Sequence, residues 1–208
     1  MNLPNILTLS RLVFVAVLMG LLASNIPYAK SMALLVFGIA GLTDYLDGYF
    51  ARKMKDITAF GRLMDPLTDK VMVCAAFVSF VEIHSNVPTK GLVPLVPAWI
   101  VVIIIAREFL VTGLRLLAAN KGNIISAGTW GKHKTVWQIV AIVVILLGLA
   151  IRDDMLKGAD PKLINDFNFV FYYIAFSVSV AVAMITVASG VLYFMQHRDL
   201  MSDGRRMH

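Results

Sequence analysis

The chain has 208 residues, of which 59% are hydrophobic and 15% charged, and its mean hydropathy is +0.77. An ordinary soluble domain has about 25% charged residues, so this composition excludes a soluble globular protein and indicates an integral membrane protein. The formal net charge of +6 does not indicate nucleic-acid binding. The basic residues flank apolar segments, where anionic lipid headgroups and phosphorylated substrates are the expected partners.

Six apolar segments have the length of roughly 20 residues that a membrane-spanning helix needs. Since lipid offers no water to pair with the backbone, these segments must form helices, and the fold class is all-α. We predict one domain over residues 1–208 with six transmembrane helices. They span about 5–24, 32–53, 66–84, 95–118, 133–151 and 168–195.

The first segment carries Asn5, Thr8 and Arg11 at a turn-like spacing, just after Pro4. This polar stripe makes Arg11 a candidate anion-binding residue, although Asn5 by itself also fits a helix cap. No basic stretch or small-residue cleavage site accompanies the segment. We therefore interpret it as a retained helix rather than a signal peptide.

The second and third segments meet in the stretch DYLDGYFARKMKDITAFGRLMDPLTD, from Asp44 to Asp69. Carboxylates in membrane segments are costly, and they usually pair, face a polar cavity or bind cations. Asp44 and Asp47 are three residues apart and Asp65 and Asp69 four, so each pair lies on one helix face. Four converging oxygen ligands suit Mg²⁺ or Mn²⁺. Asp65 alone also fits an N-cap at the start of the third helix, because Pro66 follows it.

The same stretch contains Gly48, Gly61 and Arg52, which could contact a ligand. Gly48 and Gly61 have no side chain, so they permit close approach of a ligand or a neighbouring backbone. Arg52 lies one turn after Gly48, and its charged donor fork suits a phosphate oxygen. The alternative role for Arg52 is that of a cytoplasmic anchor.

The fourth and fifth segments hold further charges, which could form a basic pocket for a second anion. Arg107 and Arg115 are eight residues apart and lie near one helix face, and Arg107 follows about ten apolar residues. Glu108 either orients a neighbouring arginine or contacts the substrate. Lys132 and Lys134 belong to the segment GKHKTVWQ. Such a pocket would suit an acceptor that already carries a phosphate.

Lysine and arginine placement predicts the orientation. The two terminal regions and the second and fourth loops, with their flanking helix ends, hold 14 of the 19 basic residues. Because cytoplasmic loops are enriched in lysine and arginine, both termini and the aspartate cluster should face the cytoplasm. We predict a multi-pass protein of a bacterial plasma (inner) membrane, since no organelle-targeting segment is evident.

The aspartate stretch fits the pattern Asp44-x2-Asp47-Gly48-x2-Ala51-Arg52-x8-Gly61-x3-Asp65-x3-Asp69 without departure. It resembles the signature of the CDP-alcohol phosphotransferase family. The resemblance implies a CDP-diacylglycerol donor, two divalent metal ions and a homodimer. It also implies that Asp44, Asp47 and Asp65 bind metal, that Asp69 is both a metal ligand and the general base, and that Gly48, Ala51, Arg52 and Gly61 contact the CDP-lipid.

Flanking motifs are similar to those of the family branch that forms phosphatidylglycerophosphate. They are NLPNILTLSR at the N-terminus, ARE at 106–108, GLR at 113–115 and the WGKHKT segment. This resemblance agrees with the predicted basic pocket and favours sn-glycerol 3-phosphate as the acceptor. The residues proposed to bind its phosphate are Arg11, Arg107, Arg115, Lys132 and Lys134.

Three other functions remain open on the sequence. An inositol phosphate acceptor would fit the same basic pocket. An intramembrane prenyltransferase also binds a metal-bound diphosphate through aspartates, but the continuation DG-x2-AR is not its pattern. A divalent cation transporter would need polar residues across the whole bilayer, whereas these acids cluster toward one side.

Overall fold

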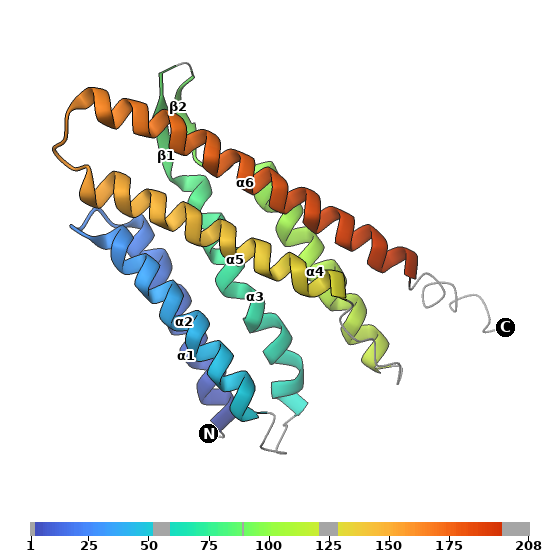
Figure 1. Ribbon diagram of the computed structural model, residues 1–208. Helices are drawn as coiled ribbons and strands as arrows, with labels where there is room; N and C mark the ends of the chain where they lie inside the picture. The colour runs from blue at the N-terminus through green and yellow to red at the C-terminus, as the bar shows by residue number, and fades with distance from the viewer. Residues whose placement is uncertain (1–2, 52–58, 89, 121–128, 197–208) are drawn as a thin grey trace.

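The structure is a computed structural model that describes the backbone of residues 3–51, 59–88, 90–120 and 129–196. Within these ranges it describes the side chains of residues 10–43, 70–88, 90–118 and 134–196. The described chain is mostly helical and contains six α-helices, one π-helical turn and a two-stranded hairpin (Figure 1). The α-helices are α1 (Leu3–Ala23), α2 (Ala29–Ala51), α3 (Ala59–Glu82), α4 (Ala98–Asn120), α5 (Thr129–Leu149) and α6 (Pro161–Gln196).

The six predicted helical segments each correspond to one observed α-helix, but α6 begins at Pro161, seven residues before the predicted start at 168. The reason lies in the residues just before the apolar run. The Asp160 side chain accepts a hydrogen bond from the Lys162 amide at 2.8 Å, and Pro161 occupies the first helical position, where its missing N–H costs nothing. Capping chemistry therefore starts this helix earlier than hydropathy indicates.

The N-terminal part of α3 corrects a second expectation. The helix begins at Ala59 rather than near Asp65, so the interpretation of Asp65 as an N-cap is wrong. Pro66 therefore lies inside the helix, where it can donate no backbone hydrogen bond to the preceding turn. The sequence ahead of Asp65 continues the helix, and the aspartate becomes an interior position of α3.

The predicted break between the third and fourth helices contains a β-hairpin, which the all-α prediction omitted. Strand β1 (His84–Val87) pairs antiparallel with β2 (Gly91–Pro94), and Val87 faces Gly91. Gly91 has a φ of 72°, a conformation that glycine adopts without steric cost. Ser85 and Val87 are buried and alternate with exposed neighbours, as expected for a strand with one face covered.

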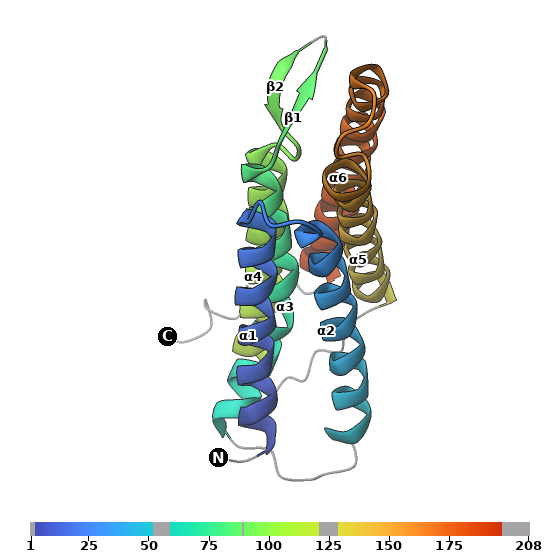
Figure 2. The same cartoon turned by 90° about the vertical axis from the view of Figure 1, so that its left-hand side faces the viewer.

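The helices pack around one apolar core. Helix α1 packs against α2 and α3, α3 against α4, α2 against α5, and α6 covers α4 and α5. Figure 2 shows the long helices running roughly along one direction, with the hairpin projecting beyond one end. Fully buried large side chains at the centre are Leu18, Phe77, Phe80, Ile100, Ile104, Ile142, Ile145 and Leu146.

Large apolar side chains also cover much of the outside of the described bundle. Leu35, Val102 and Met184 are each more than 60% exposed, although a soluble protein rarely exposes wide contiguous apolar surfaces. Two helical stretches, Lys134–Met155 and Pro161–Gln196, are long and apolar enough to cross a membrane. These features suggest a membrane protein.

Polar contacts connect α1, α2 and the π-helical turn at the end of the bundle near the hairpin. Lys30 donates hydrogen bonds to the carbonyl oxygens of Leu22 and Ser24, at the C-terminus of α1. The carboxylate of Asp154, in the π-helical turn η1 (Ala150–Met155), accepts from the Ser31 amide at 2.7 Å and from its hydroxyl at 2.6 Å. A carboxylate at the first turn of α2 also interacts favourably with the helix dipole. These contacts hold α1, α2 and η1 together.

Candidate functional site

The predicted aspartates lie on two helices that both pack against α1. Asp44 and Asp47 are in the last two turns of α2, and Asp65 and Asp69 are in the N-terminal half of α3. The C-terminal end of α2 and the N-terminal end of α3 lie at the same end of the molecule, opposite the hairpin (Figure 1). The aspartate side chains lie outside the described part of the structure. The backbone thus brings the two halves of the motif to one end of the bundle.

The other motif residues share these helices. Gly48 and Ala51 lie in the last turn of α2, and Gly61 lies in the first turn of α3. Arg52 lies outside the described residues, between the two helices. The predicted contacts of these four residues with a CDP-lipid therefore stay predictions.

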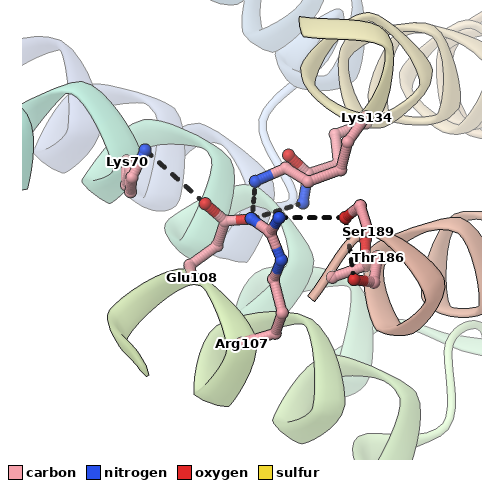
Figure 3. A network of polar contacts seen from close by, with 7 residues as sticks. Lys70, Arg107, Glu108, Lys134, Thr186 and Ser189 are labelled. Atoms are coloured by element: carbon pink, nitrogen blue, oxygen red, sulfur yellow. Dashed lines mark hydrogen bonds and ion pairs between the residues drawn. The ribbon is translucent and has the colours of Figure 1, made fainter. Parts of the chain in front are cut away.

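A buried polar network lies between α3, α4 and α5, with Glu108 of α4 at its centre (Figure 3). One carboxylate oxygen of Glu108 accepts hydrogen bonds from Lys134 and, at 3.2 Å, from Gln138, both on α5. The other oxygen lies 3.6 Å from the Lys70 ammonium group on α3. The Glu108 side chain is only 3% exposed. A carboxylate this deeply buried requires such partners to offset its lost hydration.

Arg107, the neighbour of Glu108, connects this network to α6. Its guanidinium lies 3.5 Å from the Glu108 carboxylate and donates a hydrogen bond to the Ser189 hydroxyl at 2.9 Å. Ser189 in turn donates to the carbonyl oxygen of Thr186. A Cβ atom at Gly190 would come within 3.1 Å of the Arg107 side chain. The missing side chain at Gly190 therefore leaves the space in which Arg107 lies.

Arg115 lies two turns further along α4, and it also faces α6. Its guanidinium carbon is 5.3 Å from the centre of the Tyr193 ring, within the range of a cation–π interaction. Arg107 and Arg115 thus contact positions four residues apart on α6, Ser189 and Tyr193. This confirms the prediction that the two arginines lie near one face of their helix.

The structure brings two of the predicted basic residues together at Glu108. Lys134 and Arg107 share the Glu108 carboxylate. Lys132 belongs to the first turn of α5, and its side chain lies outside the described part. Arg11 is half-buried on α1, the helix that packs against α2 and α3.

Sequence reasoning missed several members of this network. Lys70 directly follows Asp69, and it is one of the 14 basic residues from which the orientation is predicted; the sequence assigns it no further role. Gln138 is a polar residue in an apolar segment, four positions after Lys134, and this i, i+4 spacing was an available signal. Ser189 and Gly190 gave no comparable signal, because small residues are common along membrane helices.

Cationic side chains outnumber carboxylates in the described part of this network. Among its described members, Lys70, Arg107 and Lys134 are cationic, and Glu108 is the one carboxylate, which leaves an excess of two positive charges. Burying uncompensated charge is costly. Because a phosphate monoester carries up to two negative charges near neutral pH, it would balance this excess.

Comparison with known proteins assigns the family. The model for CDP-alcohol phosphatidyltransferases matches residues 1–192. The chain belongs to this family. The resemblance predicted from the aspartate signature is thereby confirmed, and the matched region extends well beyond the signature to include α4, α5 and most of α6.

Several bacterial members of the family are similar over most of their length. A protein of Bacillus subtilis (strain 168) is 39% identical over 158 residues, which cover 70% of this chain and 77% of the relative. A protein of Rickettsia bellii (strain RML369-C) is 32% identical over 193 residues, 93% of each chain. One of Haemophilus influenzae (strain ATCC 51907 / DSM 11121 / KW20 / Rd) is 38% identical over 146 residues, 68% of this chain and 73% of the relative. Each of these relatives is named CDP-diacylglycerol–glycerol-3-phosphate 3-phosphatidyltransferase.

Proposed function

We propose that this protein transfers the phosphatidyl group of CDP-diacylglycerol to sn-glycerol 3-phosphate, forming phosphatidylglycerophosphate and CMP. The observation that carries this proposal is the network of Lys70, Arg107 and Lys134 around Glu108, which is the one carboxylate among the described members of the network. Its excess positive charge favours an acceptor with a phosphate over an uncharged alcohol. The names of the relatives agree with this acceptor.

The donor site would be formed by the motif of α2 and α3. A set of four carboxylates is the ligand chemistry that Mg²⁺ and Mn²⁺ require, so Asp44, Asp47, Asp65 and Asp69 fit a pair of such ions. Two bound ions would neutralise the pyrophosphate and stabilise the CMP leaving group. Gly48, Ala51 and Gly61 would let the nucleotide approach the helices closely, and Arg52 would bind a phosphate oxygen.

The acceptor would be oriented by the basic residues of α4 and α5. Arg107, Arg115 and Lys134, with Lys132 and Arg11, would bind its phosphate and place its free hydroxyl near Asp69. Asp69 would take the proton of that hydroxyl as general base. The acceptor oxygen would then form a bond to the lipid-side phosphorus, and the bond from that phosphorus to CMP would break.

The protein would act in a bacterial plasma membrane as a bundle of six transmembrane helices. The exposed apolar side chains and the two long apolar helices support a membrane location. We place the active-site cavity and both termini on the cytoplasmic side, where lysine and arginine concentrate. A homodimer is part of the proposal through the family alone.

The function is tested by measuring CMP release from CDP-diacylglycerol by purified protein with Mg²⁺, with and without sn-glycerol 3-phosphate. We expect release that depends on the acceptor, disappears with a chelator and returns with Mg²⁺ or Mn²⁺. Asp69→Asn should reduce the rate by at least about 100-fold, because general-base catalysis contributes 10²–10⁴-fold.

The control variant is Asp166→Asn, an exposed aspartate on α6, which should keep the wild-type rate. If CMP release did not depend on glycerol 3-phosphate but increased with an inositol phosphate, the acceptor would be the inositol phosphate instead. Metal uptake into vesicles without nucleotide, together with no CMP release, would favour a transporter.

A further inference from the structure

We propose that Glu108 is a positioning residue, which couples the acceptor-phosphate site to the turn of α3 that carries Asp69. This inference rests on the proposed function and deepens it. Glu108 need not touch either substrate in this role. It would hold the cationic groups of Lys70, Arg107 and Lys134, on three helices, at fixed positions. The bound acceptor phosphate and the general base would then keep a constant distance from each other.

The geometry of the carboxylate carries the first step. Its two oxygens serve different helices, since one binds Lys134 and Gln138 of α5 while the other lies 3.6 Å from Lys70 of α3. Arg107, also within 3.5 Å, extends the connection to Ser189 on α6. Figure 3 shows these side chains converging on Glu108 from different helices. The residue therefore connects α3, α4, α5 and α6, four of the helices that contribute to the proposed acceptor site.

The second step concerns Lys70, which directly follows Asp69 in α3. Its side chain is 24% exposed, whereas those of Arg107 and Lys134 are 11% and 4% exposed. A partly exposed lysine has considerable rotamer freedom, and the ion pair with Glu108 restricts it. Through Lys70, the buried carboxylate of α4 holds the α3 turn in which Asp69 lies.

A simple neutralising role would have different consequences. Among the described side chains of the network, an excess of two positive charges remains despite Glu108, so this carboxylate does not cancel the field of its three cationic partners. If Glu108 only reduced this field, removing its charge would strengthen the attraction for an anionic acceptor. If it positions the cations, removing its charge would release Lys134 and Lys70, and acceptor binding would weaken in spite of the stronger field.

The first test is Glu108→Gln, which keeps the size of the side chain and removes its charge. We expect the KM for glycerol 3-phosphate to rise about tenfold or more and kcat to fall, with an unchanged KM for CDP-diacylglycerol. Such losses are typical when a buried charge network is broken. The matched control is Glu82→Gln, an exposed glutamate at the other end of α3. An unchanged or lower KM for glycerol 3-phosphate in Glu108→Gln would overturn the proposal.

The second test is Lys70→Met, which interrupts the connection to α3 alone. We expect kcat to fall by about tenfold, a modest part of what misplacement near reacting groups can cost, while the KM for glycerol 3-phosphate rises less than in Glu108→Gln, because Arg107 and Lys134 keep their carboxylate partner. The effect on kcat should not add to that of Glu108→Gln in the double variant, because both break the same connection. A wild-type kcat in Lys70→Met would overturn the coupling.

Lys70→Met also decides the question if Glu108→Gln does not fold, since Lys70 is partly exposed and its loss leaves Glu108 with three partners. Failure of the inference and failure of the proposed function have different signatures. A wild-type protein without acceptor-dependent CMP release would overturn both. An active wild type whose Glu108 and Lys70 variants keep wild-type kinetics would overturn the inference alone.

Discussion

At the scale of single residues, Arg107 and Arg115 have environments that a lysine could not reproduce. Arg107 uses its fork to contact Glu108 and Ser189 at once. Arg115 lies over the face of Tyr193, a contact that suits the planar guanidinium. These neighbours explain how two arginines are accommodated in a helix whose other residues are mostly apolar.

The double variant Arg107→Gln/Arg115→Gln should raise the KM for glycerol 3-phosphate. A hydrogen bond to a charged group contributes about 1.5–3 kcal/mol, so each lost contact to the acceptor phosphate would weaken binding by about 10- to 100-fold. The measurement is the initial rate of CMP release over a range of acceptor concentrations. Arg152→Gln, the same substitution at the hairpin end of the bundle, should leave this KM unchanged. An unchanged KM in the double variant would exclude both arginines from the acceptor site.

At the scale of the elements, local chemistry determines the ends of the helices and hydropathy determines their presence. Asp160 and Pro161 start α6 before its apolar run begins. The helix start at Ala59 makes Asp65 an interior residue of α3. In both cases the observed helix extends beyond the predicted one into polar residues. Hydropathy cannot locate such a boundary, because polar residues inside the helix and polar residues outside it have similar hydropathy.

The contact between α5 and α6 depends on Gly148. A Cβ atom there would lie 1.9 Å from the buried Phe171 ring, so Gly148→Ala should force the two helices apart. Overpacking of this kind typically costs about 1–3 kcal/mol. We expect a lower midpoint of thermal unfolding in detergent. Gly38→Ala, where nothing lies within 4 Å, should leave the midpoint unchanged or raise it, because alanine is the better helix former. Equal midpoints for both variants would contradict this packing.

At the scale of the whole molecule, the bundle has two different ends. One end carries the hairpin and the contacts of Lys30, Arg152 and Asp154. The opposite end carries the C-terminal part of α2 and the N-terminal part of α3, with the aspartate motif (Figure 1). An active site at the motif end, as proposed, would fit the expectation that a water-soluble acceptor enters from the cytoplasm.

The orientation is tested with single cysteines in a Cys74→Ala background. Lys157 lies in the exposed turn before α6. We expect a membrane-impermeant maleimide to label the Lys157→Cys variant in intact cells. Ser202→Cys, near the C-terminus, should react only after the membrane is opened, because the distribution of lysine and arginine predicts that this terminus faces the cytoplasm. The reverse labelling pattern would invert the topology.

The sequence by itself determined the helical class, the number of long helices and the family, because these depend on local composition and on a motif within 26 consecutive residues. It also indicated Arg107, Arg115 and Lys134 as candidate anion-binding residues, a prediction that the kinetic experiments above test.

Only the tertiary structure decided which of these charges lie together. Glu108 meets Lys134 across 26 positions of the chain, and Arg107 meets Ser189 across 82. No local periodicity encodes such contacts, which arise when α3, α4, α5 and α6 pack against one another. The space beside Gly190 and the pairing of Lys70 with Glu108 likewise exist only in the folded bundle, because each depends on the approach of two helices.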